Sequence, residues 1–465
     1  MKKHFTPVLL FLIVTSFPGF AQNIDPNGGA YNLNAGDAQH PCISKEEYRM
    51  IEQQCAENRR MLGLEIPANR STNLTAMSWP LRAAANLPDC SYYFISAGVD
   101  HDSTTAIKDY NCGSRTYNGH NGTDIAIFPY PFYKMDSNQV EVIAAAPGTI
   151  LYKSDGNFDK NCAGNNLTAN AIIISHADGS QSHYWHMKSG SVTSKIVGQT
   201  VVAGEYLGVV GSSGSSSGPH LHFEIWNGST VSSLIDPFSG TCNTWNASSW
   251  WATQKPYYEP AVVKVSANTT DIVLPACPAT ETPNEASSFT IPFQGPGLNP
   301  GYAKFYAFVR DETAGTTATL SILNPNGTTY LSWTRNCNTT YHTSYWSYSK
   351  LLPTTPGTYT FNATYNGATC STSFDIQGPL NINEATTSEF KIYPNPASSS
   401  VNIATDKNIA GTLSITDVAG RKMKSMQLSS AMIEISTAEF PTGLYFVTLN
   451  RGTETTTQKL LICRE

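Results

Sequence analysis

Charged residues are scarce in this chain, making up 14% of its 465 residues. A typical soluble protein has about a quarter. Long helices with charged outer faces are therefore not expected, and the abundance of Ser, Thr, Asn, Gly and Tyr favours β-rich modules. Basic residues are the rarer charged group, since 29 Lys and Arg stand against 35 Asp and Glu. This acidic balance argues against nucleic acid as a partner.

Long hydrophobic runs are also missing, because no segment reaches the roughly 20 apolar residues that a membrane span needs. The one notable run, Val8 to Val14, follows Lys2 and Lys3 and precedes small residues up to Ala21. This pattern predicts a secretory signal peptide over residues 1–21 rather than a membrane anchor. Its removal would take the 29 basic residues to 27, against 35 acidic ones.

Ten cysteines follow the predicted signal peptide. In the oxidising environment of a secreted protein, an even number of cysteines favours disulfides over metal binding. The connectivity cannot be deduced from the sequence. Spacing alone suggests three local pairs: Cys42 with Cys55, Cys90 with Cys112, and Cys337 with Cys370.

The length predicts about two to four domains. Residues 22–95 form an N-terminal segment whose clearest signal is the stretch ISKEEYRMIEQQCAENRRMLGL. Ser44 is a candidate N-cap with Glu47 three residues later, and Gly63 can end the helix. The helix is either an ordinary surface helix or part of a removable propeptide, and both interpretations stay open.

Residues 96–260 consist of short β-like runs, and six of the ten histidines fall between positions 120 and 222. After a linker rich in Pro, Thr and Glu, residues 265–378 alternate apolar and polar positions with frequent turns, which predicts an Ig-like or related β-sandwich. Its Tyr and Trp residues could line a carbohydrate-binding face. Core and surface packing of a sandwich explains them more simply.

Residues 388–465 form another strand-rich block, predicted to be a small β-sandwich. Three motifs stand out: Tyr393 to Pro396, Asp417 with Gly420 and Arg421, and Gly443 to Tyr445. Together they resemble the C-terminal sorting domain of type IX secretion cargo. The resemblance implies type IX secretion machinery as a partner and a location outside the cell or on its surface.

The stretch GPHLHFEIW places His220 and His222 two residues apart in an alternating pattern. On a β-strand such residues point to the same face, where two imidazoles can bind a metal ion. Upstream, His120 and Asp124 lie on a Gly-containing loop that leads into DIAIF. Each motif alone is also compatible with a chance pair or a backbone-capping turn.

Taken in order, the His-x-x-x-Asp motif, the later His186 in HYWHM and GPHLHFE resemble the lysostaphin-type, LytM-like zinc metallopeptidases that cleave peptidoglycan. This resemblance spans about residues 115 to 228. It implies an antiparallel-sheet domain of the duplicated hybrid motif type and one zinc ion, Zn²⁺, per catalytic domain. The implied zinc ligands are His120, Asp124 and His222, and the implied catalytic pair is His186 and His220.

The implied set makes chemical sense, because three protein ligands leave one tetrahedral position for water, as in catalytic zinc sites. The paired histidines would handle the proton and the oxyanion, in an order the sequence leaves open. By strand alternation, His186 is predicted to share a face with Tyr184, and His183 to point away in a structural role. Glu224 shares the face of His222 and is a candidate outer partner.

His101 lies outside the motif, beside acidic neighbours, and His176 ends a predicted strand. Two insertions, FPYPFYKMDSNQ and SDGNFDKNCAGNNLTAN, are predicted to form groove walls, and Cys162 is a candidate disulfide anchor of the second.

Three functions remain in view. The first is a secreted zinc metalloendopeptidase acting on peptidoglycan cross-links or Gly-rich peptides, the second a protease of glycine-rich extracellular proteins such as elastin, and the third a non-catalytic wall-binding adhesin. The presence of all five site residues argues against the third. The oligomeric state is not predicted.

Overall fold

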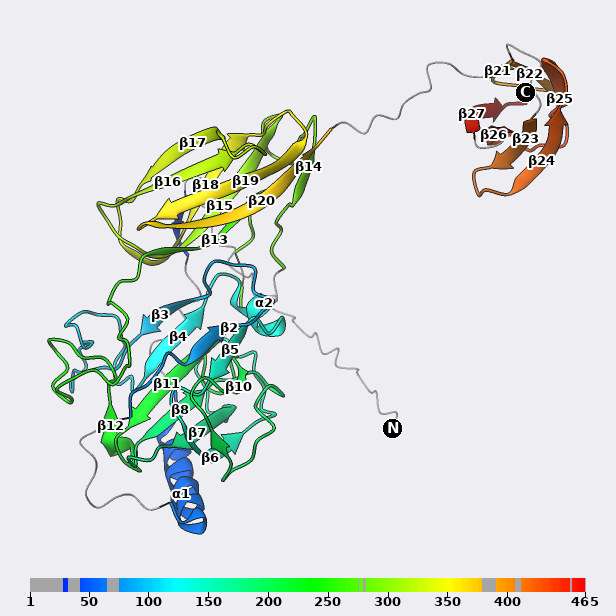
Figure 1. The fold of residues 1–465 in the computed structure, drawn as a ribbon. Coiled ribbons are helices and arrows are strands. Elements are labelled where there is room, and N and C mark those ends of the chain that lie inside the picture. Colours follow the sequence, from blue (N-terminus) through cyan, green and yellow to red (C-terminus); the bar gives the residue numbers. More distant parts are fainter. Residues whose placement is uncertain are drawn as a thin grey trace, which may run out of the picture. The chain divides into compact units, whose positions relative to one another are not determined.

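The computed structural model describes residues 28–31, 42–64, 75–274, 276–278, 282–378, 390–405, 411–451 and 454–464. It is mainly β, with antiparallel sheets, as the sequence predicts (Figure 1). The chain divides into two compact units, Met1–Pro379 and Leu380–Glu465. The predicted signal peptide, residues 1–21, lies outside the described residues.

The largest sheet of the first unit has the strand order β3-β4-β11-β8-β7-β6-β9, with β12 also paired to β11. The strands are β3 Tyr93–Ala97, β4 Thr123–Ile127, β6 Gly148–Ser154, β7 Ala171–Ser175, β8 Gln181–Trp185, β9 Thr200–Val201, β11 His220–Trp226 and β12 Leu234–Ile235. A short 3₁₀ helix, Val231–Ser233, precedes β12. Strand β11 lies in the middle of this sheet, so its residues are held by neighbours on both sides.

A smaller sheet of the order β10-β5-β2 belongs to the same region. Its strands are β2 Leu81–Ala83, β5 Val140–Ile143 and β10 Tyr206–Val209. Leu221, Phe223 and Ile225 of β11 join residues of β5 and β10 in one hydrophobic core. Because side chains alternate along a strand, the even-numbered residues of β11 are left to face the other way.

Helix α1, Lys45–Leu62, packs on the opposite face, and Figure 1 shows it at the end of the large sheet near β6 and β7. The predicted boundaries are confirmed: the Ser44 side chain accepts a hydrogen bond from the Glu47 backbone N–H, and Gly63 ends the helix in a left-handed conformation. Apolar side chains of this segment pack against the sheet in a cluster with residues of β6, β7, β8 and β11: Ile43, Tyr48, Ile51 and Cys55.

The aromatic insertion does not form the groove wall expected from the sequence. It contains helix α2, Pro131–Asp136, and its aromatic side chains are buried except for the partly buried Tyr133. Phe128 and Tyr130 join a cluster shared with the sandwich, and Phe132 joins the core between the two sheets. Burial in these cores outweighs exposure because large aromatic side chains gain most from leaving water.

The second half of the first unit contains two sheets, with the orders β1-β18-β15-β13 and β14-β20-β19-β16-β17. Their strands are β1 Gly29–Ala30, β13 Ala261–Asn268, β14 Ser288–Thr290, β15 Tyr302–Glu312, β16 Thr317–Leu323, β17 Thr329–Asn336, β18 Tyr341–Leu351, β19 Gly357–Tyr365 and β20 Ala368–Gln377. Residues from both sheets share one core. Many of the aromatic side chains are buried, as a structural role requires.

Disulfides join Cys90 to Cys370, Cys112 to Cys242, and Cys162 to Cys277. The local pairs predicted from spacing, Cys90 with Cys112 and Cys337 with Cys370, are therefore wrong, and Cys42 does not pair with Cys55 either. The actual bonds close sequence separations of 280, 130 and 115 residues, so topology rather than spacing selects the partners. Cys162 does anchor its insertion by a disulfide.

The second unit has two sheets, β21-β22-β25 and β24-β23-β26-β27, around a single core. Their strands are β21 Phe390–Tyr393, β22 Ser400–Thr405, β23 Gly411–Asp417, β24 Lys422–Leu428, β25 Met432–Ser436, β26 Gly443–Arg451 and β27 Glu454–Ile462. The Asp417 carboxylate accepts hydrogen bonds from the Ala419 and Arg421 backbone N–H groups, which closes the turn singled out in the sequence.

Neither helix in the described part of the chain has the length and apolarity that crossing a membrane would require.

Candidate metal centre

The centre of the candidate site is the pairing of β11 with β4. In this antiparallel pair His222 lies directly opposite Asp124, so their side chains project from the same face of the sheet. The His222 Nδ1 atom lies 2.8 Å from Asp124 Oδ1. His220 projects from the same face two residues earlier, as predicted from the alternation.

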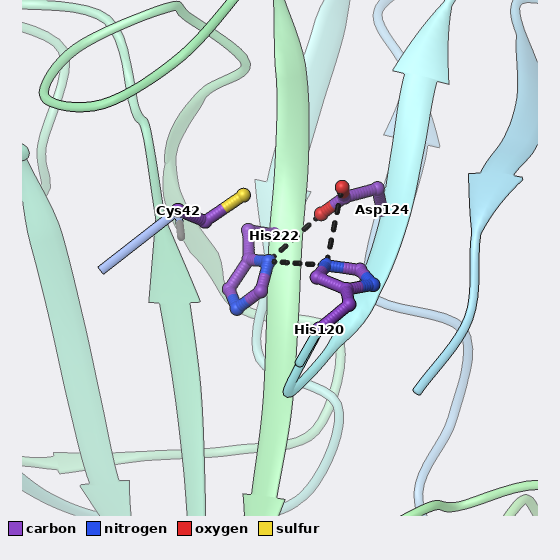
Figure 2. A group of neighbouring side chains, drawn as sticks. All are labelled: Cys42, His120, Asp124 and His222. Atoms are coloured by element: carbon purple, nitrogen blue, oxygen red, sulfur yellow. Dashed lines mark hydrogen bonds and ion pairs between the residues drawn. The ribbon is translucent and has the colours of Figure 1, made fainter. Parts of the chain in front are cut away.

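His120 reaches the site from the loop before β4. Its Nδ1 donates to the Gly98 carbonyl over 2.6 Å, which leaves Nε2 turned toward His222 and Asp124 (Figure 2). The loop is held from behind by Asp100, whose backbone N–H donates to the His120 carbonyl and whose carboxylate accepts from the Gly119 N–H.

The spacing of the three groups fits a metal ion. His120 Nε2 lies 3.1 Å from His222 Nδ1 and 3.2 Å from Asp124 Oδ2, and His222 Nδ1 lies 2.8 Å from Asp124 Oδ1. Ligands about 2.0 to 2.1 Å from a tetrahedral zinc ion are separated by about 3.3 Å. Two imidazoles and a carboxylate are also the donors that zinc accepts, so the residues fit this group.

Gly122 allows the close approach of the loop to β11. A Cβ atom at this position would lie 2.6 Å from His222 Cε1 and 2.9 Å from the Phe223 carbonyl oxygen. Any side chain here would push against the His222 ring, so the glycine protects the geometry of the centre.

His186 faces the same site, although alternation along β8 predicted that it would share the face of Tyr184. Tyr184 instead packs in the core between the sheets. Strand β8 ends at Trp185, and His186 adopts a left-handed backbone with φ 64°, which turns its side chain toward the opposite face. There its ring centroid lies 4.7 Å from that of His220.

The two paired histidines are oriented alike. His186 Nδ1 donates to the Ser213 carbonyl over 2.6 Å, and His220 Nδ1 donates to the Gly218 carbonyl over 2.8 Å. The Gly- and Ser-rich stretch before β11 supplies both acceptors. The Nε2 atoms of His186 and His220 are buried and make no hydrogen bond within the described part of the chain, although His220 Nε2 lies 3.5 Å from Asp124 Oδ1. Buried polar atoms are rarely left unpaired, and such atoms often mark a site for a ligand.

Glu224 lies behind His222, in the place where an outer partner is expected. Its Oε1 accepts from His222 Nε2 over 2.8 Å, and it also accepts from Trp226 Nε1 over 2.7 Å and from the Tyr48 hydroxyl. These bonds fix the His222 ring so that Nδ1 points at the metal position. Carboxylates commonly orient metal-binding histidines in this way.

The charges of the site suit a cation. Although burial raises the pKa of the Asp124 carboxyl, the neighbouring His120 and His220 hold it well below its usual value. Burial lowers the pKa of His120, but the Asp124 charge outweighs it and raises the pKa to about 9. A metal ion must therefore displace a proton from His120, so low pH will oppose its binding.

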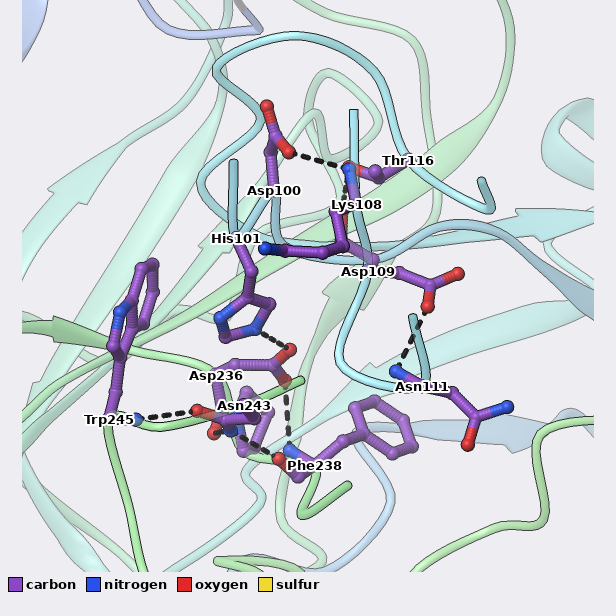
Figure 3. Close-up of polar contacts among 12 residues, drawn as sticks. Asp100, His101, Lys108, Asp109, Asn111, Thr116, Asp236, Phe238, Asn243 and Trp245 are labelled. Carbon is purple, nitrogen blue, oxygen red and sulfur yellow. Dashed lines mark hydrogen bonds and ion pairs between the residues drawn. The ribbon is translucent and has the colours of Figure 1, made fainter. Parts of the chain in front are cut away.

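Three further described histidines, His101, His176 and His183, lie outside this group. His101 Nε2 lies 2.9 Å from Asp236 Oδ2, and its ring packs against Trp245 (Figure 3). Nearby, Asp100 Oδ1 accepts from the Lys108 backbone N–H over 3.1 Å, which ties this network to the loop behind His120. The His176 ring is hydrogen-bonded through Nδ1 to the Pro147 carbonyl and through Nε2 to the Ser182 hydroxyl.

His183 lies on the sheet face that α1 covers, against the Trp226 ring, and hydrogen-bonds Gln181. The prediction that it points away from His186 is therefore wrong, since the turn at His186 brings both to one side. Burial lowers the pKa of His183 to about 4, so the ring is neutral and packs as part of the structure.

Sequence reasoning missed Cys42, which belongs to this site in the structure. Its Sγ, together with one ligand atom each of His120, Asp124 and His222, forms a group whose members all lie within 4.8 Å of one another. Its position just before the N-cap of α1 was the available signal. Only the docking of the helix shows which face Cys42 approaches.

Residues 118–235 match the family model described as peptidase family M23, and residues 391–463 match the secretion system C-terminal sorting domain. The chain carries an M23 peptidase domain. The M23 match covers every one of the five site residues, and the resemblance drawn from the motifs is confirmed. The sorting domain indicates that the protein is secreted or held at the cell surface.

Two named bacterial proteins are similar to part of this chain. The chain is 37% identical over 98 residues to the cell division protein DipM of Caulobacter vibrioides, which covers 20% of this chain and 15% of that protein. It is 39% identical over 84 residues to the DD-carboxypeptidase/endopeptidase Mpg of Neisseria meningitidis, which covers 18% of this chain and 16% of that protein. The similarity is thus confined to a small part of each relative.

Solved structures with a similar region include the catalytic domain of the prophage-encoded M23 protein EnpA from Enterococcus faecalis, at 24% identity and a TM-score of 0.21, covering 31% of this chain and 88% of that one. Another is the catalytic domain of lysostaphin from Staphylococcus simulans, at 23% identity and a TM-score of 0.20, covering 34% of this chain and 96% of that one.

Proposed function

We propose that the protein is a secreted zinc-dependent metalloendopeptidase that hydrolyses peptide bonds in peptidoglycan cross-links or Gly-rich peptides. The observation that carries the proposal is the convergence of three zinc-type donors with two buried imidazole nitrogens that make no hydrogen bond among the described residues, on one face of the M23 sheet. The name of the Neisseria relative, a DD-carboxypeptidase/endopeptidase, supports the choice of an endopeptidase.

In this proposal His120, Asp124 and His222 hold the zinc ion. When bound, zinc polarises the scissile carbonyl and makes water acidic enough to attack at neutral pH. Gly98 and Glu224 hold the two imidazoles in the orientation that leaves one nitrogen of each free for the ion. These hydrogen bonds fix the two rings in advance, which lowers the free-energy cost of ordering the zinc ligands.

His186 and His220 act on protons and on the developing oxyanion. The Nδ1 of each ring donates to a backbone carbonyl, so the neutral ring presents the lone pair of Nε2 to the site. Each ring can therefore accept a proton at Nε2 and, once protonated, donate a hydrogen bond from the same atom. Both functions are needed for amide hydrolysis, and the two rings lie side by side.

The substrate is tested by incubating the purified, zinc-loaded protein with muropeptides, a pentaglycine peptide and elastin, with cleavage products identified by mass spectrometry. We expect cleavage within a cross-link or between glycines, together with one zinc ion per chain by elemental analysis. Preferential cleavage of elastin would assign the protein to the alternative protease class. Full activity after complete removal of metal would contradict the mechanism, and zinc binding without any cleavage would favour a wall-binding module.

A further inference from the structure

The Cys42 thiol occupies a position between the two halves of the M23 site. Its Sγ and one ligand atom each of His120, Asp124 and His222 all lie within 4.8 Å of one another. The Sγ and one nitrogen each of His186 and His220 form a second group with the same limit. Figure 2 shows the Cys42 side chain pointing toward the three proposed ligands. The sulfur therefore lies where the metal ion would face the catalytic pair.

Two independent features mark this position as one for a ligand. Among the described residues Cys42 is the further donor grouped with His120, Asp124 and His222, and the buried Nε2 atoms of His186 and His220 make no hydrogen bond among those residues. A thiolate binds zinc at about 2.3 Å, which places the sulfur about 3.6 Å from the other ligands of a tetrahedral ion. The ligand atoms grouped with Cys42 Sγ all lie within 4.8 Å, an upper limit that is compatible with that value.

We propose that Cys42 is the fourth ligand of the zinc ion in the full chain, and that residues 42–64 hold the peptidase closed. This inference rests on the proposed zinc centre. A structural zinc site has four protein ligands, whereas a catalytic one keeps a position open for water. With the sulfur bound, that position is filled. The Cys42 thiol would lose its proton to solvent when it binds the ion. On release the thiolate would recover a proton from solvent, and the fourth position would be open to water.

The N-terminal segment is built to hold Cys42 at the site. Ile51 and Tyr48 of α1 are buried against the sheet. Polar contacts add to this packing, since Asn58 Nδ2 donates to the Leu151 carbonyl over 2.9 Å and Glu52 Oε1 accepts from the Val231 N–H over 2.7 Å. Capped at Ser44, the helix fixes the direction in which Cys42, two residues earlier, enters the site.

The segment also restricts access. Tyr48 donates to Glu224, the carboxylate behind His222, and the Tyr117 hydroxyl lies 2.6 Å from Cys42 Sγ. The exposed fractions of the site residues are His120 2%, Asp124 5%, His186 0%, His220 8% and His222 1%. A peptide bond cannot contact groups this deeply covered, so the N-terminal segment must move before hydrolysis.

The ligand is tested by loading the full chain with Co²⁺ in place of zinc and recording its absorption spectrum. Thiolate bound to Co²⁺ produces a charge-transfer band in the near ultraviolet, which nitrogen and oxygen ligands do not. We expect the band in the wild type and in Cys463→Ala, which removes an exposed thiol, and its loss in Cys42→Ala. Each protein should still bind one Co²⁺, measured by elemental analysis.

The outcomes separate this inference from the proposed function. One Co²⁺ without the band in the wild type, or a band that survives in Cys42→Ala, would overturn the role of Cys42 and leave the zinc centre intact. Failure of every protein to bind metal would overturn both.

Closure is tested by turnover of a quenched fluorescent glycine-rich peptide by the full-length variant Cys42→Ala/Ile51→Glu. Removing the ligand and placing a charge in the helix interface should raise turnover at least about tenfold, because the competent fraction of molecules increases. Cys42→Ala/Met50→Glu is the matched control, since Met50 is 48% exposed on the same helix, and it should show a smaller rise. Loss of metal from the first variant, or equal turnover by both variants, would refute closure by the docked helix.

Discussion

Glu312 of the sandwich and the paired histidines of the adjoining M23 sheet are all buried, but their polar atoms are satisfied to different degrees. In the sandwich, the fully buried Glu312 accepts hydrogen bonds from Ser344, from Trp346 over 3.0 Å and from Arg335 over 3.4 Å. In the M23 sheet, the Nε2 atoms of His186 and His220 make no hydrogen bond within the described residues. A buried group with all its partners stabilises a fold, whereas an unsatisfied atom costs stability, and two such atoms that converge beside metal-type donors suit a ligand or a reaction.

The sharpest way to test this contrast is to remove a proposed metal ligand. His222→Ala should lose metal and lower kcat/KM by more than about 10³-fold, because it deletes both an ion ligand and the partner of Asp124. His342→Ala changes a 48% exposed side chain in the sandwich and should leave both properties unchanged. Elemental analysis and peptide hydrolysis on the same samples provide the measurement. Retention of zinc by His222→Ala would remove this residue from the ligand set.

Substitution of the unpaired histidines should separate metal binding from turnover. His186→Ala and His220→Ala should each keep one zinc ion and lose about 10²- to 10⁴-fold in kcat, the usual contribution of a general acid or base. Zinc content and kcat are measured together. A variant that lost zinc in proportion to activity would move its residue into the ligand set.

Two buried carboxylates, one in each region, allow a matched comparison. Glu224→Gln should weaken zinc binding about 10- to 100-fold, as expected when the outer partner of a metal-binding histidine is changed. Glu312→Gln should lower thermal stability with zinc affinity unchanged, because its partners belong to the sandwich. Competition with a chelator measures the affinity. Equal zinc affinity of both variants would show that Glu224 has only a structural role.

The smallest effect on catalysis is expected from the second unit. A chain that ends before residue 388 should hydrolyse peptides at the wild-type rate, since all five proposed site residues lie in the first unit. In a host with type IX secretion, the same deletion should leave the protein inside the cell envelope. Immunoblots of cells and medium measure its location. Normal release of the shortened protein would contradict the role of the sorting domain in export.

Local patterns determined much of this protein directly. The caps of α1 and the alternation of β11 could be predicted, because they depend on backbone geometry within a few residues. The M23 and sorting motifs were also readable. The same local reasoning failed at His186, where a single left-handed residue at the end of β8 reverses the face expected from alternation.

Only the tertiary structure decided the contacts between distant segments. The disulfide partners, the inward packing of the aromatic insertion and the approach of Cys42 to the metal centre each depend on how strands and α1 stack. Such contacts are selected by the topology of the whole unit and by burial of large apolar surfaces, for which spacing along the chain carries no information. The sequence therefore proposed the five residues that converge in the M23 domain, and the packing of α1 alone revealed the sulfur placed among them.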